Sequence, residues 1–182
     1  MVIGSIAGMA KTSMGANAFL AVAIMAIGNA GGRIAAGILS DRIGRKRTLL
    51  AIFSFQALLM FAAIPLTSTA SATPAVVVLL AALIGFNYGA NLALFPSYAK
   101  DLWGMKNFGV NYGVLFTAWG FGGLVMSRFS ESLVARSGSF SASFIAAASL
   151  LLAGTVIIFL MRDKKEEMRQ ELRRMEAKPA PA

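Results

Sequence analysis

Cysteine and histidine are both absent from the 182 residues. Without cysteine the chain has no disulfide, no thiolate metal ligand and no cysteine nucleophile. Without histidine it lacks the commonest metal ligand and the commonest acid–base group that titrates near neutral pH. Acidic residues are scarce as well, eight against seventeen lysines and arginines, and none lies in the long apolar runs described below. We therefore expect no enzyme, no metal site and no cofactor.

The composition is strongly apolar. Hydrophobic residues make up 57% of the chain, charged residues only 14%, and the mean hydropathy is +0.70. A soluble chain of this size would leave far too much apolar surface in contact with water. The lipid bilayer is therefore the first partner that we expect.

Membrane-length apolar runs recur along the chain. An α-helix needs about 20 apolar residues to cross ~30 Å of hydrocarbon. Five such runs are present, at about 16–39, 49–66, 74–95, 109–127 and 140–161. Residues 1–10 are apolar but only about half that length, and we interpret them as the end of a truncated helix. We expect an all-α, polytopic membrane domain over 1–161 and a charged cytoplasmic tail over 162–182.

The basic residues are distributed unevenly between the two sides of these runs. Thirteen of the seventeen fall on the side of the 40–48 connection and the C-terminal tail, three fall on the other side, and Arg33 lies inside a run. Short loops rich in lysine and arginine stay in the cytoplasm. The pattern predicts a multi-pass protein with a cytoplasmic C-terminus. The net charge of +9 then reflects topology, and we expect no nucleic-acid partner.

Arg33 is the one charge inside a predicted span. An intramembrane charge costs roughly 2.5 to 3.5 kcal/mol even on the lenient insertion scale. Helical side chains tilt toward the N-terminus, which here aims Arg33 at the middle of the bilayer and argues against snorkelling. Asn29 lies one turn earlier on the same face. Since no span contains a carboxylate, we predict that Arg33 and Asn29 bind a carboxylate-bearing substrate. A structural role for Arg33 is the alternative.

Glycine and polar residues concentrate in the first, third and fourth spans. Small residues let membrane helices approach closely, and polar ones face partners or a cavity. We therefore expect these three spans to line a cavity and the plain spans, 49–66 and 140–161, to face lipid. Tyr88, Tyr112 and Trp119 are the aromatic residues that we expect on the cavity wall. Interfacial anchoring is the alternative for the aromatics.

The segment from Gly37 to Arg47 has the spacing G-x-x-x-D-R-x-G-R-K-R. It resembles the cytoplasmic loop motif of the major facilitator superfamily, at Gly37, Asp41, Arg42, Gly44, Arg45 and Lys46. The resemblance implies alternating access by two six-helix halves, of which this chain is the C-terminal six-helix bundle with its first helix truncated. Asp41 could then pair with arginine, and the cations could form a breakable gate network. Simple positive-inside anchoring is the alternative.

Three stretches, Gly28–Gly37, Gly85–Asn91 and Asn107–Gly120, resemble the oxalate/formate antiporter family, which includes bacterial monocarboxylate carriers. In that family the arginine that matches Arg33 binds the substrate carboxylate. The oxalate exchangers add a lysine on the eleventh helix, and here Trp119 stands near that place. The resemblance thus implies a small monocarboxylate such as lactate, formate or pyruvate.

The expected partners are this small organic anion and a missing N-terminal transporter half. The expected location is a bacterial or archaeal plasma (inner) membrane, because the chain shows no targeting segment and has the family resemblance. A second hypothesis from another class stays open. The chain could be a split or non-transporting membrane module that docks with another transporter subunit.

Overall fold

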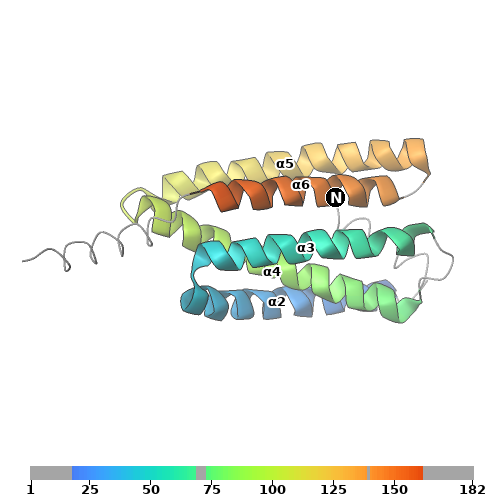
Figure 1. Cartoon of the computed structure of the whole chain (residues 1–182), viewed down its shortest axis with the longest axis horizontal. Coiled ribbons are helices and arrows are strands. Elements are labelled where there is room, and N and C mark those ends of the chain that lie inside the picture. The colour runs from blue at the N-terminus through green and yellow to red at the C-terminus, as the bar shows by residue number, and fades with distance from the viewer. Residues whose placement is uncertain (1–17, 69–72, 139, 162–182) are drawn as a thin grey trace, which may run out of the picture.

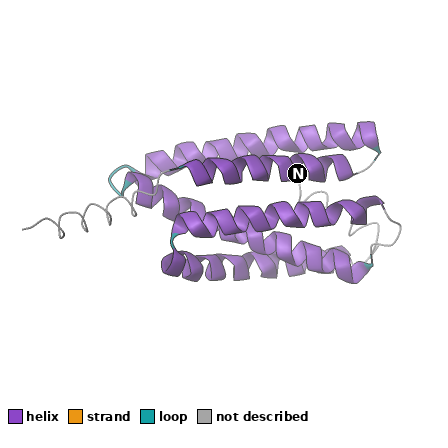
Figure 2. Cartoon of the chain, viewed as in Figure 1, coloured by secondary structure: helices purple, strands orange, loops and turns teal. Residues whose placement is uncertain are grey.

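A computed structural model describes residues 18–68, 73–138 and 140–161, and these residues contain five helices and no strand (Figures 1 and 2). The helices are α2 (Ala18–Ile43), α3 (Arg45–Ser68), α4 (Pro74–Trp103), α5 (Phe108–Ser137) and α6 (Ser141–Leu160). Each is long and apolar enough to cross a membrane. This confirms the all-α, multi-span prediction. The partial helix expected over 1–10 and the tail over 162–182 lie outside the described residues.

Several helices are longer than the apolar runs that predicted them. The helices α4 and α5 have 30 residues each, or about 45 Å at 1.5 Å per residue, against ~30 Å of hydrocarbon. Pro74 stands in the first turn of α4, where no backbone N–H is needed. Gly138 ends α5 with a left-handed φ of +66°. The sequence located the apolar part of each helix, and the polar turns extend it beyond the membrane.

Successive helices run in opposite directions, so that the α2–α3 junction, the α4–α5 connection and the end of α6 share one end of the bundle (Figure 1). We call this end the Gly44 end, after the residue between α2 and α3. The helix α2 packs chiefly on α4, and α3 packs chiefly on α6 and also on α4. One buried cluster includes Leu94 and Tyr98, and the other includes Met60 and Phe144.

The contact between α2 and α4 depends on glycine. A Cβ added at Gly32 would lie 1.9 Å from the carbonyl oxygen of Phe86, and one added at Gly89 would lie 1.9 Å from that of Asn29. Gly28 and Gly85 are equally tight, with added Cβ atoms 2.3 and 2.2 Å from backbone oxygens. Each helix therefore presents two glycines four residues apart, the spacing that lets membrane helices meet backbone to backbone. The predicted close approach of small residues is confirmed here.

The helix α5 packs differently, although it is also rich in glycine. A Cβ added at Gly113, Gly120, Gly122 or Gly123 would meet nothing within 4 Å. Ser130 is the only buried residue of this helix, and its hydroxyl donates to the Ser143 hydroxyl of α6 at 2.9 Å. Among the described residues, α5 makes few contacts with either α4 or α6, and hollows remain along its inner face.

Candidate functional site

An aromatic ladder follows one face of α5. Phe108, Tyr112, Phe116 and Trp119 recur every three or four residues and therefore share a face of the helix. Successive ring centroids are 5.5, 5.7 and 5.0 Å apart, distances typical of favourable aromatic pairs. The ladder holds Tyr112 and Trp119 in a continuous apolar wall.

This wall bounds a hollow of about 380 Å³ between α3, α4 and α5, which we call the aromatic hollow. Its lining residues are Phe53, Tyr88, Asn91, Leu92, Phe95, Tyr112, Leu115, Phe116, Ala118 and Trp119. The three predicted aromatic site residues therefore line one hollow. No hydrogen bond joins either tyrosine hydroxyl or the Trp119 indole to another described residue, so a ligand could accept a hydrogen bond from each.

A second hollow, of about 410 Å³, adjoins the first, and we call it the amide hollow. Its walls are Gln56, Ile84, Tyr88, Asn91, Trp119, Gly123, Met126, Ala147, Leu150 and Leu151. Three of these residues, Tyr88, Asn91 and Trp119, also line the aromatic hollow. The two hollows therefore share a wall on the inner side of α5.

Three fully buried amide oxygens of α3 and α4 have no hydrogen-bond partner among the described residues. They belong to Gln56 and Asn91, which line the amide hollow, and to Asn87, which lines neither hollow. The Nδ2 of Asn87 donates to the carbonyl oxygen of Leu83 at 3.0 Å, and the Nδ2 of Asn91 donates to that of Asn87 at 3.0 Å. A buried acceptor left unpaired costs about 1 to 3 kcal/mol. Such groups usually have a ligand or an ordered water as partner.

Arg33 and Asn29 lie on α2 and line neither hollow. The two residues share a helix face, as predicted, and the Nε of Arg33 donates to Oδ1 of Asn29 at 3.0 Å. The Arg33 side chain is exposed and contacts no carboxylate among the described residues. Because α2 continues to Ile43, Arg33 lies ten residues, or about 15 Å, from the Gly44 end. The predicted substrate residues thus form two groups, one on α2 and one around the hollows.

A backbone contact between α2 and α4 shows that the two groups lie at a similar depth in the bundle. Gly89, next to Tyr88, packs directly against the backbone carbonyl of Asn29. Tyr88 and the Asn29–Arg33 pair therefore occupy a similar level along the bundle.

The sequence motif after Gly37 is almost entirely helical. Gly44 is the only residue between α2 and α3, and its φ of +96° is a conformation that favours glycine. The connection that the apolar runs leave at 40–48 is therefore reduced to Gly44. A single glycine suffices because the last turn of α2 and the first turn of α3 carry the polar residues of the motif.

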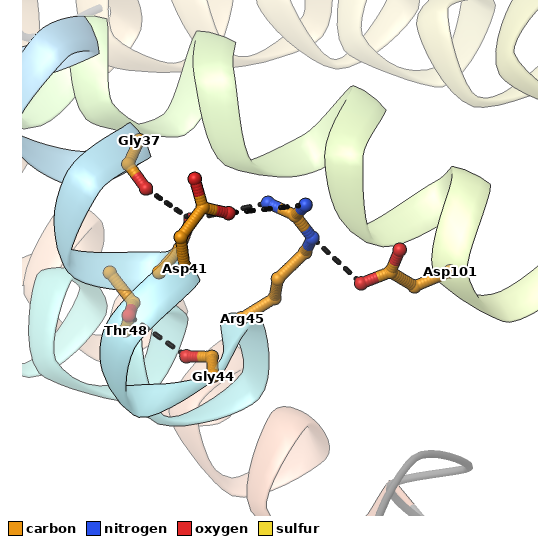
Figure 3. A network of polar contacts seen from close by, with 7 residues as sticks. Gly37, Asp41, Gly44, Arg45, Thr48 and Asp101 are labelled. Carbon is orange, nitrogen blue, oxygen red and sulfur yellow. Dashed lines mark hydrogen bonds and ion pairs between the residues drawn. The ribbon is translucent and has the colours of Figure 1, made fainter.

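Arg45 is the centre of a charge cluster at the Gly44 end (Figure 3). Its Nε donates to Oδ2 of Asp101 on α4 at 2.7 Å, and its Nη2 lies 3.5 Å from Oδ1 of Asp41. Its Nη1 also donates to the hydroxyl of Ser40 at 3.2 Å, which in turn donates to the carbonyl oxygen of Gly37 at 2.9 Å. The pairing of Asp41 with an arginine is confirmed. Arg45, on α3, thus contacts polar side chains of both α2 and α4.

The other two cations of the motif behave differently. The Nζ of Lys46 donates to the carbonyl oxygen of Met161, at the end of α6, where helix carbonyls carry partial negative charge. Arg42 is exposed and has no ion pair or hydrogen bond with another described residue. The cluster therefore connects α2, α3, α4 and α6 without Arg42.

Sequence reasoning missed several of these residues. Asp101 could have been found, because the predicted topology places it at the same end as the motif. Phe108 and Phe116 could have been found from their helical spacing to Tyr112. By contrast, the expectation that the two plain spans face only lipid is wrong, since Phe53 and Gln56 of α3 and three residues of α6 line the hollows. Within the described ranges, no group of three His, Cys, Asp or Glu side chains could hold a metal ion.

Comparison with known proteins gives one family. Residues 1–182 match the family model described as Major Facilitator Superfamily. The chain is 33% identical over 108 residues to the uncharacterized MFS-type transporter YhjX of Escherichia coli K12, which covers 57% of this chain and 25% of that protein. It is 31% identical over 133 residues to the MFS transporter asaE of Aspergillus flavus, and this match covers 72% of this chain and 29% of that protein.

A third relative is the oxalate:formate antiporter of Oxalobacter formigenes, which is 28% identical over 142 residues. The match covers 78% of this chain and 33% of the antiporter. The chain thus spans about a quarter to a third of the length of these relatives.

Proposed function

Because the chain belongs to the major facilitator superfamily, we propose that it is the C-terminal half of a membrane transporter for small organic anions, with a monocarboxylate as the preferred substrate. An N-terminal half completes the transporter, and the two halves work by alternating access. The oxalate:formate antiporter among the relatives supports an organic anion as the substrate class. Members of this family are transporters, which supports transport over catalysis.

One observation carries the proposal: Arg33 is an intramembrane cation whose side chain is exposed and has no carboxylate partner among the described residues. An arginine at that depth is normally paired or functional. Its bond to Asn29 uses Nε and leaves the two terminal nitrogens available. Those nitrogens can hold a carboxylate in two parallel hydrogen bonds.

The hollows supply the remaining walls of the site. We assign Arg33 and Asn29 to the carboxylate, and Tyr88, Tyr112 and Trp119 to the apolar remainder of the solute. Arg33 is the only cation inside the predicted spans, which favours one carboxylate over two.

Competition between substrates tests this preference. In proteoliposomes that contain the complete transporter, unlabelled lactate is expected to inhibit uptake of labelled lactate at concentrations at least about tenfold lower than oxalate does. The second carboxylate of oxalate has no cation to meet in this half. Stronger inhibition by oxalate than by lactate would contradict the monocarboxylate assignment.

The charge cluster is proposed as the gate element, with Asp41, Arg45 and Asp101 as its working contacts. The Arg45–Asp101 pair is partly exposed, with side-chain accessibilities of 25% and 39%, so each contact contributes only about 0.5 to 1 kcal/mol. A contact of that strength can break and re-form during rocking. Gly37, Arg42, Gly44 and Lys46 complete the proposed gate motif.

A double-mutant cycle tests the gate. Arg45→Gln and Asp101→Asn are each expected to change the uptake rate by roughly two- to fivefold, the factor that corresponds to about 0.5 to 1 kcal/mol. Arg45→Gln already lacks the contact with Asp101, so the double variant should resemble Arg45→Gln alone. In the control cycle, Asp101→Asn combined with Arg128→Lys should show additive effects. Additive effects of Arg45→Gln and Asp101→Asn would reject the pair as a gate contact.

The same proposal places the protein in the plasma membrane with its C-terminus and the Gly44 end in the cytoplasm, as the distribution of basic residues predicts. The competing hypothesis is a split or non-transporting module that docks with another subunit. Genomic DNA upstream of Met1 distinguishes them. Six further spans in frame, or in an adjacent gene, support a transporter half, and a lone gene with no such partner contradicts it.

A further inference from the structure

We propose that the Gly44 end of the bundle carries a binding surface for the headgroups of anionic phospholipids. Its residues are Arg42, Lys100, Trp103 and Lys106, and we call them the basic rim. The inference uses the proposed orientation of the chain but not its substrate, so it goes beyond the transport of a small anion. It also gives Arg42 a partner, which the charge cluster around Arg45 does not.

The Gly44 end has more positive charge than its own carboxylates can neutralise. Its described residues include six lysines and arginines but only two acidic residues, Asp41 and Asp101. Both aspartates already contact Arg45. At the opposite end the described residues are nearly balanced, with two arginines and one glutamate. The excess of positive charge is therefore concentrated at one end of the bundle.

Three of these cations remain available to an outside anion. The side chains of Arg42, Lys100 and Lys106 are exposed, and none has an ion pair or hydrogen bond with another described residue. An exposed cation near a membrane surface is attracted to anionic lipids. The three side chains are thus candidates for binding lipid phosphates.

The charge cluster brings the ends of α2 and α4 together. The guanidinium of Arg45 contacts Asp41 on α2 and Asp101 on α4 at the same time (Figure 3). Arg42 directly follows Asp41, and Lys100 directly precedes Asp101. The free cations of the two helices therefore lie on the same end of the bundle, around one network, although they are far apart in the sequence.

The length of α4 places the rim at the depth of the headgroups. At 1.5 Å per residue, Lys100 lies about 17 Å and Trp103 about 22 Å from the middle of this helix. With α4 centred in a bilayer, the hydrocarbon ends at about 15 Å and the headgroup region at about 22 Å. Trp103 is 52% exposed and Met105 is 63% exposed. Exposed tryptophan is typical of this interface.

An anionic lipid fits the rim better than the chain's own tail does. Residues 162–182 contain seven basic and five acidic residues, so the tail has a net positive charge like the rim. The cytoplasmic leaflet, by contrast, is rich in anionic lipids. Each lysine or arginine near such a surface strengthens the attraction by a factor of about five. An arginine such as Arg42 can also hold a phosphate through two parallel hydrogen bonds.

Energy transfer from tryptophan to a pyrene-labelled lipid tests the rim. The chain has two tryptophans, so Trp119→Phe leaves Trp103, in the rim itself, as the only donor. The full 182-residue chain with this change is reconstituted in phosphatidylcholine liposomes. These contain a small fraction of either pyrene-labelled phosphatidylglycerol or pyrene-labelled phosphatidylcholine. Transfer falls off steeply with distance, so Trp103 reports chiefly on lipids at the Gly44 end.

At low salt we expect labelled phosphatidylglycerol to be enriched around Trp103 by at least about tenfold over labelled phosphatidylcholine. Arg42→Gln should lower this enrichment about two- to fivefold. Glutamine at Arg42, Lys100 and Lys106 together should bring it close to one. Arg128→Gln removes the same charge near the other end and should leave the enrichment unchanged. Circular dichroism checks that each variant is folded.

Equal transfer to the two lipids in the parent chain would overturn the inference, and so would an enrichment that the triple variant retains. Loss of the enrichment on addition of millimolar inorganic phosphate would identify soluble anions as the occupants, and would overturn it as well. None of these outcomes bears on carboxylate uptake, so this inference and the proposed function can fail separately.

Discussion

Replacing Arg33 with lysine is expected to lower carboxylate uptake by at least about tenfold while the protein still inserts into the membrane. Lysine keeps the positive charge but replaces the planar fork of arginine with a single ammonium group. The Nε bond to Asn29, at 3.0 Å, orients the guanidinium in the native chain. Lysine has no atom that can make this bond and also present two parallel donors to a carboxylate.

Initial rates of labelled lactate uptake measure the effect, and quantification of the protein in purified membranes shows insertion. The control is Arg128→Lys. Arg128 is 87% exposed and, among the described residues, pairs with Glu131 one turn later on α5. The same chemical change there should leave uptake within about twofold. Normal uptake by Arg33→Lys would reject Arg33 as the binding cation.

Replacing Gly32 with alanine is expected to destabilise the fold by about 3 kcal/mol or more. The new Cβ would lie 1.9 Å from the carbonyl oxygen of Phe86 and 2.7 Å from its carbonyl carbon. The obstacle is backbone, so no side-chain rotation relieves it and α2 must move away from α4. Overpacking of this kind costs about 1 to 3 kcal/mol even where side chains can adjust.

The adjacent residue provides a matched control. A Cβ at Gly31 would meet nothing within 4 Å, so Gly31→Ala changes the same helix in the same way without the clash. Thermal unfolding in detergent, followed by circular dichroism, should show a clearly lower transition temperature for Gly32→Ala than for Gly31→Ala. Equal transition temperatures would show that the glycine contact between α2 and α4 does not hold the bundle together.

The sequence predicted the helices and their class well, because crossing a bilayer imposes a length and an apolarity that can be counted. It also placed Arg33 and Asn29 on one helix face, since residues four apart on a helix are neighbours whatever the tertiary structure. Asp41 and Arg45 follow the same rule, and their contact is present at 3.5 Å. Local geometry was thus available from spacing alone.

Contacts between helices were harder to predict. A membrane helix that is apolar all round has no amphipathic pattern to show which face meets protein and which meets lipid. For this reason α3 was expected to face lipid, although Phe53 and Gln56 line the hollows. The single-residue turn at Gly44 was also missed, because the polar motif around it suggested a loop and gave no sign that both helices continue into it.

The contacts within the charge cluster could be predicted from the sequence only in part. The topology placed Asp101 at the Gly44 end, but only the packing of α4 beside α3 brings it to 2.7 Å from Arg45. The role of Lys46 at the end of α6 depends on the position of the last helix, which lies more than one hundred residues later in the chain. Such contacts follow from tertiary structure and not from spacing.

We conclude that this chain is half of a carrier for small carboxylates. Exchange of labelled for unlabelled lactate across a membrane tests this conclusion most directly. Proteoliposomes that contain the complete transporter are loaded with unlabelled lactate and placed in labelled lactate. We predict saturable entry of the label that depends on the internal lactate and is lost in Arg33→Lys. Entry no faster than in protein-free liposomes, for lactate, formate and pyruvate alike, would contradict the account.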